Sequence, residues 1–221
     1  MWAAGLVGAQ PVATPTATAT PACPRAGAAV VERFISADCA DCWSAADVGA
    51  VQPGTWLFDW IAQTSAGTEA PLAAASNSEA QDRAQRAGGP SPTGMQVLTV
   101  RSTLLRTAGL KLSVQSGPAW NGYFGLRLEA RGRVPAGSSA WLALVEQVPA
   151  NAEGSVAERQ LVRSVAGPLP LDTLRPDRAT SHLRALHWPE TAQPTRLQAR
   201  GWIEAPDGAL LAIATDRCPL R

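Results

Sequence analysis

Residues 34–47 read FISADCADCWSAAD and place two cysteines, Cys39 and Cys42, three positions apart. The residues just before them, 28–35 (AAVVERFI), are rich in β-branched side chains and predict a strand. From Cys39 onward the spacing of Ala, Trp and Asp is compatible with a helix, which Pro53 would end. The stretch therefore predicts a strand, a tight turn and a helix that carries the cysteine pair in its first turn.

The elements that follow the cysteines predict the class of the first domain. A second strand is predicted at 55–61, a helix at 71–87 and a third strand at 95–101, with 110–115 as an antiparallel partner. The order β-α-β-α favours a small parallel sheet covered by helices. The first predicted domain is therefore α/β and spans residues 25–116.

From about Gly117 onward the pattern changes to that of an all-β segment. In 123–134 (YFGLRLEARGRV) apolar side chains alternate with Gly, Arg and Glu, which is the period of a strand with one face in water. Further strands separated by Pro, Gly and Asp, without a helix among them, favour an antiparallel β-sandwich at 117–221. These strands are predicted at 140–148, 158–165, 181–188, 195–204 and 208–215, and the predicted inward side chains include Phe124, Leu126, Leu128, Leu142, Leu144, Leu197 and Ile203.

Composition limits the classes of partner and the cellular location. Of the 221 residues 46% are hydrophobic and 17% are charged, and the formal net charge is +1. These values favour a globular protein and give no concentrated basic surface for nucleic acid. Residues 1–24 open with a short apolar run and continue with Thr, Ala and Pro, which predicts a signal-peptide remnant and a flexible tether. No later stretch reaches the ~18 apolar residues that span a bilayer. We therefore expect an exported protein, periplasmic or secreted, with no nucleic acid partner and no membrane span.

A Cys-x-x-Cys pair at the start of a helix that follows a strand is typical of thiol–disulfide exchange. The helix N-terminus would stabilise the thiolate of Cys39 as the attacking nucleophile, and Cys42, predicted to be more buried, would resolve the mixed disulfide. Asp38 and Asp41 flank Cys39, and their charges are expected to raise the pKa of its thiol. The expected partners are thiols and disulfides of proteins or small molecules, and this chemistry needs no cofactor.

Other interpretations of the four cysteines stay open. Cys39 and Cys42 could form a structural disulfide with each other, or each could pair with Cys23 or Cys218. The chain would then be a non-enzymatic envelope protein that is structural or binds a partner through its β domain. We predict that Cys23 and Cys218 pair with each other, because they flank the folded region.

The histidines and the nearby tryptophans are expected to be structural. A zinc site made of the cysteine pair with His182 and His187 is disfavoured, because the two pairs lie on different predicted domains. No metal is therefore expected. The tryptophans closest to the cysteines are expected to be core residues because of their large apolar area: Trp43, Trp56 and Trp60.

Residues 30–47 (VVERFISADCADCWSAAD) resemble the opening of a thioredoxin-like family of exported bacterial proteins of unassigned function, in which Val-Val-Glu-Leu-Phe-Thr-Ser precedes Cys-x-x-Cys. The resemblance implies a thioredoxin-like fold for residues 25–116 and redox use of the cysteine pair. It also implies a cis-proline that faces the cysteines, for which Pro92 is the best candidate. Arg33 and Trp43 depart from the family pattern, which has an apolar residue and a proline there. The positions that match are Glu32, Phe34, Ser36, Cys39, Cys42, Ala46 and Asp47.

Overall fold

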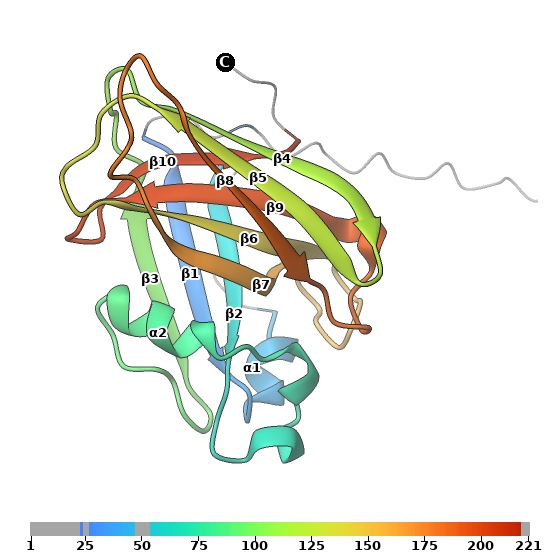
Figure 1. The fold of residues 1–221 in the computed structure, drawn as a ribbon. Helices are drawn as coiled ribbons and strands as arrows, with labels where there is room; N and C mark the ends of the chain where they lie inside the picture. The colour runs from blue at the N-terminus through green and yellow to red at the C-terminus, as the bar shows by residue number, and fades with distance from the viewer. Residues whose placement is uncertain (1–22, 24–26, 47–53, 218–221) are drawn as a thin grey trace, which may run out of the picture.

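Two sheets make up most of the protein in this computed structural model, which describes residues 23, 27–46 and 54–217 of the chain. One sheet has seven strands in the order β10-β9-β6-β7-β2-β1-β3, and the other has three in the order β4-β5-β8 (Figure 1). The strands are β1 (Ala29–Ser36), β2 (Trp56–Ala62), β3 (Val97–Thr103), β4 (Lys111–Trp120), β5 (Tyr123–Arg131), β6 (Ser139–Val148), β7 (Arg159–Pro170), β8 (Thr180–His187), β9 (Leu197–Glu204) and β10 (Leu210–Thr215). The helices are α1 (Ala40–Ser44) and α2 (Glu79–Arg86), with 3-10 turns η1 (Gly67–Glu69), η2 (Ala73–Ala75) and η3 (Pro194–Arg196).

The prediction of a thioredoxin-like α/β domain at 25–116 is wrong, because the described chain is mostly β. β1 and β2 pair in parallel, but β3 joins the other side of β1 in the antiparallel direction. In the described part of the chain the two α-helices span five and eight residues. Helices this short do not cover both faces of a sheet in the way that an α/β fold requires.

The helix predicted at 71–87 is interrupted at Asn77. The main-chain N–H of Asn77 donates to the carbonyl of Ile61 in β2 at 3.1 Å, and its side-chain Oδ1 accepts from the N–H of Ala80 at 2.8 Å. Asn77 therefore ties the chain to the sheet and satisfies one of the free amides at the start of α2. The segment Ser-Asn-Ser at 76–78 precedes the start of a new helix, α2. The many helix-forming residues on both sides of this segment had suggested a single continuous helix over 71–87.

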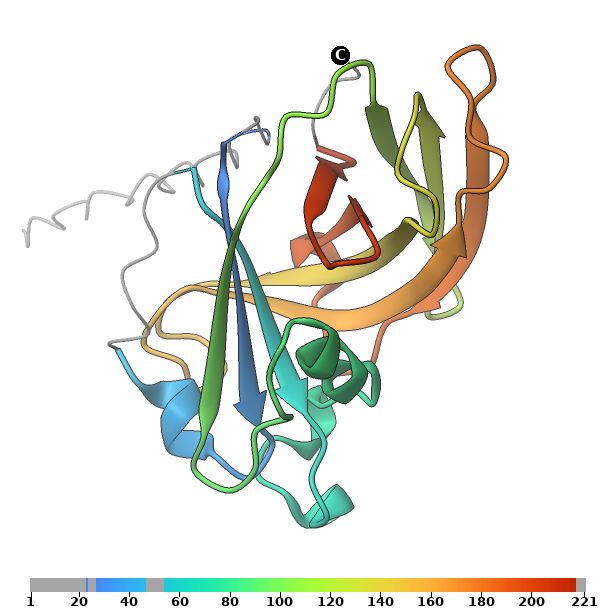
Figure 2. The ribbon, with the colours of Figure 1, turned by 90° about the vertical axis from the view of Figure 1, so that its left-hand side faces the viewer.

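The three-stranded sheet packs over one half of the seven-stranded sheet (Figure 2). A leucine-rich core with side chains from both sheets lies between them. The alternation predicted at 123–134 is confirmed, since Leu126, Leu128 and Ala130 are buried and the side chains between them are not. This half of the protein agrees with the expected β-sandwich. Among the predicted inward side chains Leu126, Leu128, Leu142, Leu144 and Ile203 lie in this core, Phe124 is half-buried against it, and Leu197 is buried outside it.

One sheet takes strands from both sides of the boundary predicted between residues 116 and 117, and that boundary falls inside β4. β2 pairs in parallel with β7, with Asp59 opposite Leu161. The carboxylate Oδ2 of Asp59 also accepts the main-chain N–H of Gln160 at 2.7 Å. The region that carries the cysteine pair is therefore continuous with the sandwich.

Aromatic side chains pack on both faces of β1 and β2. On the face covered by α2, Phe34 stacks on Trp60 with ring centroids 5.9 Å apart, and Trp56 lies in the same cluster. On the opposite face Trp43 packs with apolar residues of β1, β2 and β7. The expected core placement of the three tryptophans is confirmed, because none of them is more than 6% exposed. Figure 2 shows α1 and α2 on the two sides of the sheet edge formed by β3.

Candidate functional site

The cysteine pair lies where β1 ends and turns into α1. Ala37 continues the ladder by donating its N–H to the carbonyl of Ala62 at 2.9 Å, and the N–H of Cys39 then returns to the carbonyl of Ser36 at 3.0 Å. This tight turn places Cys39 at the N-cap of α1. The predicted strand, turn and helix start are therefore present at these positions, with a helix that ends at Ser44 rather than near residue 51.

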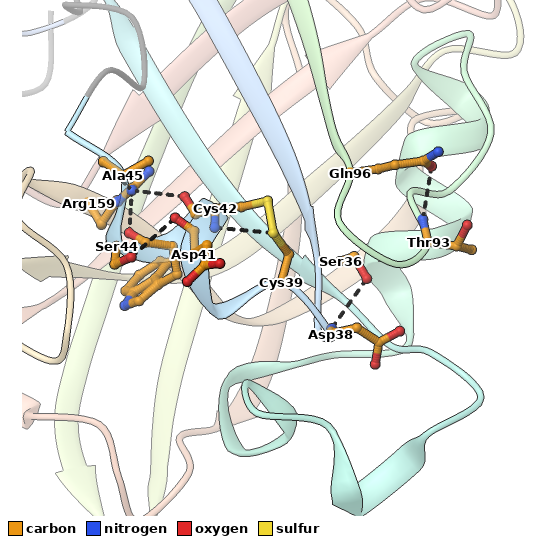
Figure 3. Close-up of a disulfide and its surroundings, with 11 residues drawn as sticks. Ser36, Asp38, Cys39, Asp41, Cys42, Ser44, Ala45, Thr93, Gln96 and Arg159 are labelled. Atoms are coloured by element: carbon orange, nitrogen blue, oxygen red, sulfur yellow. Dashed lines mark hydrogen bonds between the residues drawn. A yellow bond between two sulfur atoms is a disulfide. The ribbon is translucent and has the colours of Figure 1, made fainter.

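Cys39 and Cys42 form a disulfide with a Cα–Cα distance of 5.2 Å (Figure 3). The main-chain N–H of Cys42 points at the Sγ atom of Cys39, 3.1 Å away. The predicted order of burial is reversed: Cys39 is 0% exposed, whereas Cys42 is half-buried. Cys42 is therefore the more exposed residue of the pair.

Arg159 of β7 holds α1 against the sheet. Its Nη2 donates to the carbonyls of Trp43 and, at 3.2 Å, of Ala45, and at 3.3 Å to the carbonyl of Cys42. Its Nε donates to the Ser155 hydroxyl at 2.8 Å. These carbonyls have no partner within the short helix, so the guanidinium takes the place of the next helical turn. Burial, partly offset by the nearby charge of Asp59, lowers the pKa of Arg159.

Trp43 is fixed at the same place by a second contact. Its indole Nε1 donates to the carbonyl of Glu153 at 2.7 Å, and its ring lies under the Arg159 guanidinium. Trp43 thus stands where the resembled family has a proline, and here it packs α1 onto the loop between β6 and β7. Neither contact was predicted from the sequence, because residues 153 and 159 lie more than a hundred positions beyond the cysteines.

The two aspartates beside Cys39 differ in their surroundings. Asp38 is half-buried, and its carboxylate accepts the hydroxyl of Thr64 at 2.7 Å. Asp41 is exposed and lies in the first turn of α1. Both aspartates are close in sequence to the disulfide. The prediction that their charges raise the pKa of the Cys39 thiol stays a prediction.

Pro92 does not provide the predicted cis-proline. In the described residues the cis peptide bond is Gly167–Pro168 in β7, and the bond before Pro92 is trans. Pro92 is itself buried, in the loop between α2 and β3. Figure 3 shows Thr93 and Gln96 of this loop on the far side of β1 from Cys42, with the N–H of Thr93 donating to the Gln96 side chain at 3.3 Å.

The remaining cysteines and the histidines lie away from the pair in the chain. Cys23 is disulfide-bonded. Cys218 falls outside the described residues, so the predicted Cys23–Cys218 pairing stays a prediction. His182 and His187 both lie on β8, where His182 contacts the carbonyl of Pro170 at 2.8 Å and His187 packs edge-on against Tyr123. The described part of the chain holds no cluster of three metal-ligating side chains.

Buried charges support the sheet beneath the site. Arg33, the second departure from the family pattern, donates its Nε to Asp59 at 2.6 Å, and both side chains are almost fully buried. On the opposite face Arg83 of α2 binds Glu32 through two nitrogens, at 2.8 and 2.7 Å, and also pairs with Glu204. The signal for these pairs in the sequence was the presence of charged residues inside two predicted strands, in the segments ERF (32–34) and FDW (58–60). The sequence does not identify the partners.

Comparisons with family models, with curated proteins and with solved structures found no match to this chain. Across the residues that the structure describes, no helix has the length and apolar character needed to cross a membrane.

Proposed function

We propose that this protein carries out thiol–disulfide exchange, with Cys42 as the sulfur that an incoming thiol attacks. The observation that carries this proposal is the unequal exposure of the two cysteine residues: Cys39 is fully buried and Cys42 is half-buried. Exchange requires a nucleophile to approach one sulfur along the S–S bond, so access decides which sulfur is attacked. The roles predicted from the sequence are thereby exchanged between the two cysteines.

The proposed reaction is the oxidation of a dithiol. A substrate thiolate forms a bond to the Cys42 sulfur, the bond between the two protein sulfurs breaks, and its electron pair leaves on Cys39. A second substrate thiolate then attacks the substrate sulfur of this mixed disulfide and releases Cys42. The substrate is oxidised to a disulfide, the protein is reduced to a dithiol, and the two protons lost by the substrate are taken up by the protein thiols.

The leaving sulfur has a hydrogen-bond donor already aimed at it. The N–H of Cys42 lies 3.1 Å from the Cys39 sulfur, and a thiolate there accepts this bond more strongly than a disulfide sulfur does. The negative charges of Asp38 and Asp41 act in the opposite direction. The site therefore combines one local stabilising contact with two opposing charges, which suits slow exchange rather than a highly reactive thiol.

A second candidate is a structural disulfide in a non-enzymatic envelope protein. The observation that favours it is the firm attachment of α1, whose carbonyls accept from Arg159 and whose Trp43 ring packs beneath the same guanidinium. In both cases export fits the disulfides, because they persist in the periplasm or outside the cell. In the second case the described β-rich half would supply the binding surface.

The reduction potential of the Cys39–Cys42 pair separates these two functions. Purified protein is equilibrated with glutathione or dithiothreitol buffers, quenched with acid and alkylated, and the state of the pair is read by peptide mass. A potential near or above ~ −230 mV fits an exchanging couple, whereas one below ~ −300 mV fits a structural bond. Cys23 provides an internal control, because its disulfide is reported by a separate peptide of the same sample.

A further inference from the structure

A pocket of about 450 Å³ lies between the β5–β6 loop and the β7–β8 loop, at one end of the sandwich. Both loops are on the left-hand side of Figure 1. Its volume is within the range of pockets that hold small organic ligands, roughly 300–1,000 Å³. It shares no residue with the disulfide site. Its lining consists of residues 133–138 from the first loop and of Leu171, Asp172 and residues 174–176 from the second.

The charge on this pocket is mainly positive. Arg133 and Arg175 line it from opposite loops, and among the described residues neither guanidinium forms an ion pair with a carboxylate. Arg175 is held in place because its Nη1 donates to the carbonyls of Asp172, at 3.1 Å, and Leu174, at 2.7 Å. Asp172 is the acidic residue of the lining. Two exposed cations against one carboxylate leave the pocket with an excess positive charge that attracts anions.

The interior of the pocket has an apolar part and an unsatisfied hydroxyl. Leu171 and Leu174 are 4% and 5% exposed and belong to the sandwich core, so one wall is continuous with that core. Ser138 is 7% exposed, and its Oγ atom has no hydrogen-bond partner among the described residues. The leucine wall therefore offers contact area for a hydrocarbon group, whereas the Oγ atom of Ser138 is itself shielded from solvent and lies out of reach of a ligand.

The pocket is held in shape before any ligand binds. The N–H of Gly132 donates to the carbonyl of Arg175 at 3.3 Å and ties the two loops together. Gly132 has a φ of 132°, and a Cβ atom there would lie 2.6 Å from the carbonyl oxygen of Gly109. Its position is therefore set by the close approach of a neighbouring backbone. A preformed pocket loses little conformational entropy on binding.

We propose that this pocket binds a small amphipathic anion, namely a single carboxylate on a short apolar chain. The carboxylate lies between Arg133 and Arg175, and the chain packs against Leu171 and Leu174. Planar guanidinium groups match carboxylate oxygens well, so the exposed arginines suit the charged end of such a ligand and the buried leucines suit its apolar chain. This inference is independent of the disulfide chemistry.

Isothermal titration calorimetry with octanoate, 1-octanol and inorganic phosphate tests the proposal on the full chain. Octanoate should bind with one site per chain, and 1-octanol, which lacks the charge, should bind at least about tenfold more weakly. Phosphate, which lacks the apolar chain, should also bind more weakly than octanoate. Equal binding of octanol would overturn the role of the arginines, and equal binding of phosphate would overturn the apolar part of the proposed ligand.

Variants locate the binding site. Arg133→Gln and Arg175→Gln should each weaken octanoate by about tenfold, because each removes a charged hydrogen bond. Arg131→Gln is the matched control, since Arg131 is exposed on β5 and does not line the pocket. Ala136→Trp should abolish binding by filling the pocket without altering any charge. Thermal unfolding of each variant verifies that it is folded. The proposal is overturned if Arg131→Gln weakens octanoate as much as the pocket variants do, or if Ala136→Trp leaves binding unchanged.

Discussion

The guanidinium of Arg159 lies 5.0 Å from the centre of the Trp43 ring and donates a hydrogen bond to the main-chain carbonyl of the same tryptophan. Arg159 begins β7, whereas Trp43 follows the second cysteine of the disulfide. A residue 116 positions later in the chain therefore fixes α1 on the sheet. The same nitrogen, Nη2, also donates to the carbonyl of Cys42 at 3.3 Å, so the contact reaches the disulfide residue itself.

Arg159→Met should destabilise the protein while keeping a long apolar side chain in place. The buried carbonyl of Trp43 and the half-buried carbonyl of Ala45 lose their donor, and we expect a loss of about 2–4 kcal/mol in the free energy of unfolding, measured in urea. Arg131→Met is the control, because an exposed arginine without such contacts should change stability by less than about 0.5 kcal/mol. Equal effects of the two substitutions would show that Arg159 does not hold α1.

The two cysteines should behave differently when each is left alone. In Cys39→Ser the remaining Cys42 should react readily with a disulfide reagent such as 5,5′-dithiobis(2-nitrobenzoate) and retain it as a stable mixed disulfide. In Cys42→Ser the reaction rate of the buried Cys39 should be lower by a factor of at least about ten, because the chain must open locally first. Stopped-flow absorbance gives both rates. Faster reaction of Cys39 would restore the roles predicted from the sequence and contradict the proposed direction of attack.

Arg83→Met should leave two buried carboxylates without a cation. Glu32 and Glu204 both bind Arg83, and removal of one partner of a buried pair costs about 3–5 kcal/mol. Arg86→Met on the same helix is the control: Arg86 is exposed over the Trp141 ring, a contact worth about 1 kcal/mol or less. Chemical denaturation of both variants gives the comparison. A loss below that of Arg86→Met would mean that the carboxylates find other partners.

Two glycines in the strands of the sandwich should respond in opposite ways to a methyl group. A Cβ on Gly201 would lie 2.6 Å from a Val114 methyl and 3.1 Å from Leu128, so Gly201→Ala should cost about 1–3 kcal/mol through overpacking. A Cβ on Gly125 meets nothing within 4 Å, and Gly125→Ala should be neutral or stabilising by up to about 1 kcal/mol. Thermal unfolding of the two variants, scored by the sign of the change, decides whether the two sheets are packed as described.

Leu126→Ala tests the register of β5. Leu126 is 0% exposed between the two sheets, and its truncation should cost about 2–5 kcal/mol. Leu183→Ala in the neighbouring strand β8 removes the same atoms from a side chain that is 71% exposed, and should change stability by less than about 0.5 kcal/mol. Urea unfolding curves of both proteins provide the measurement, and similar losses would mean that the inward face of β5 is misassigned.

Local patterns in the sequence located the strands well. The strands predicted at 28–35, 55–61 and 95–101 appear at Ala29–Ser36, Trp56–Ala62 and Val97–Thr103, because β-branched and aromatic runs between turn residues form strands in most contexts. The turn that leads into Cys39 is also where the sequence placed it. The alternation at 123–134 identified the buried face of β5 for the same reason.

Pairing between distant strands was beyond the reach of these patterns. Two such pairings are the antiparallel pairing of β3 with β1 and the parallel pairing of β2 with β7 at Asp59 and Leu161. Both depend on how the whole sheet assembles, and a short stretch of sequence holds no information about that. Burial of charged side chains was missed for a related reason. Arg159 and Arg83 are buried only because their partners come from other elements, and a lone arginine in a sequence is expected on the surface.

The junction of β2 with β7 sets an order of events during synthesis. The first three strands of the large sheet leave the ribosome early, but the partner of β2 arrives only with Arg159–Pro170. Until then β2 has an open parallel edge, which is the kind of surface on which unfinished chains associate with each other. Loop closure over such a separation is slow, so the joining of these two strands should limit the rate of folding. A chain cut between β3 and β7 would keep that open edge permanently, and neither piece should remain monomeric by itself.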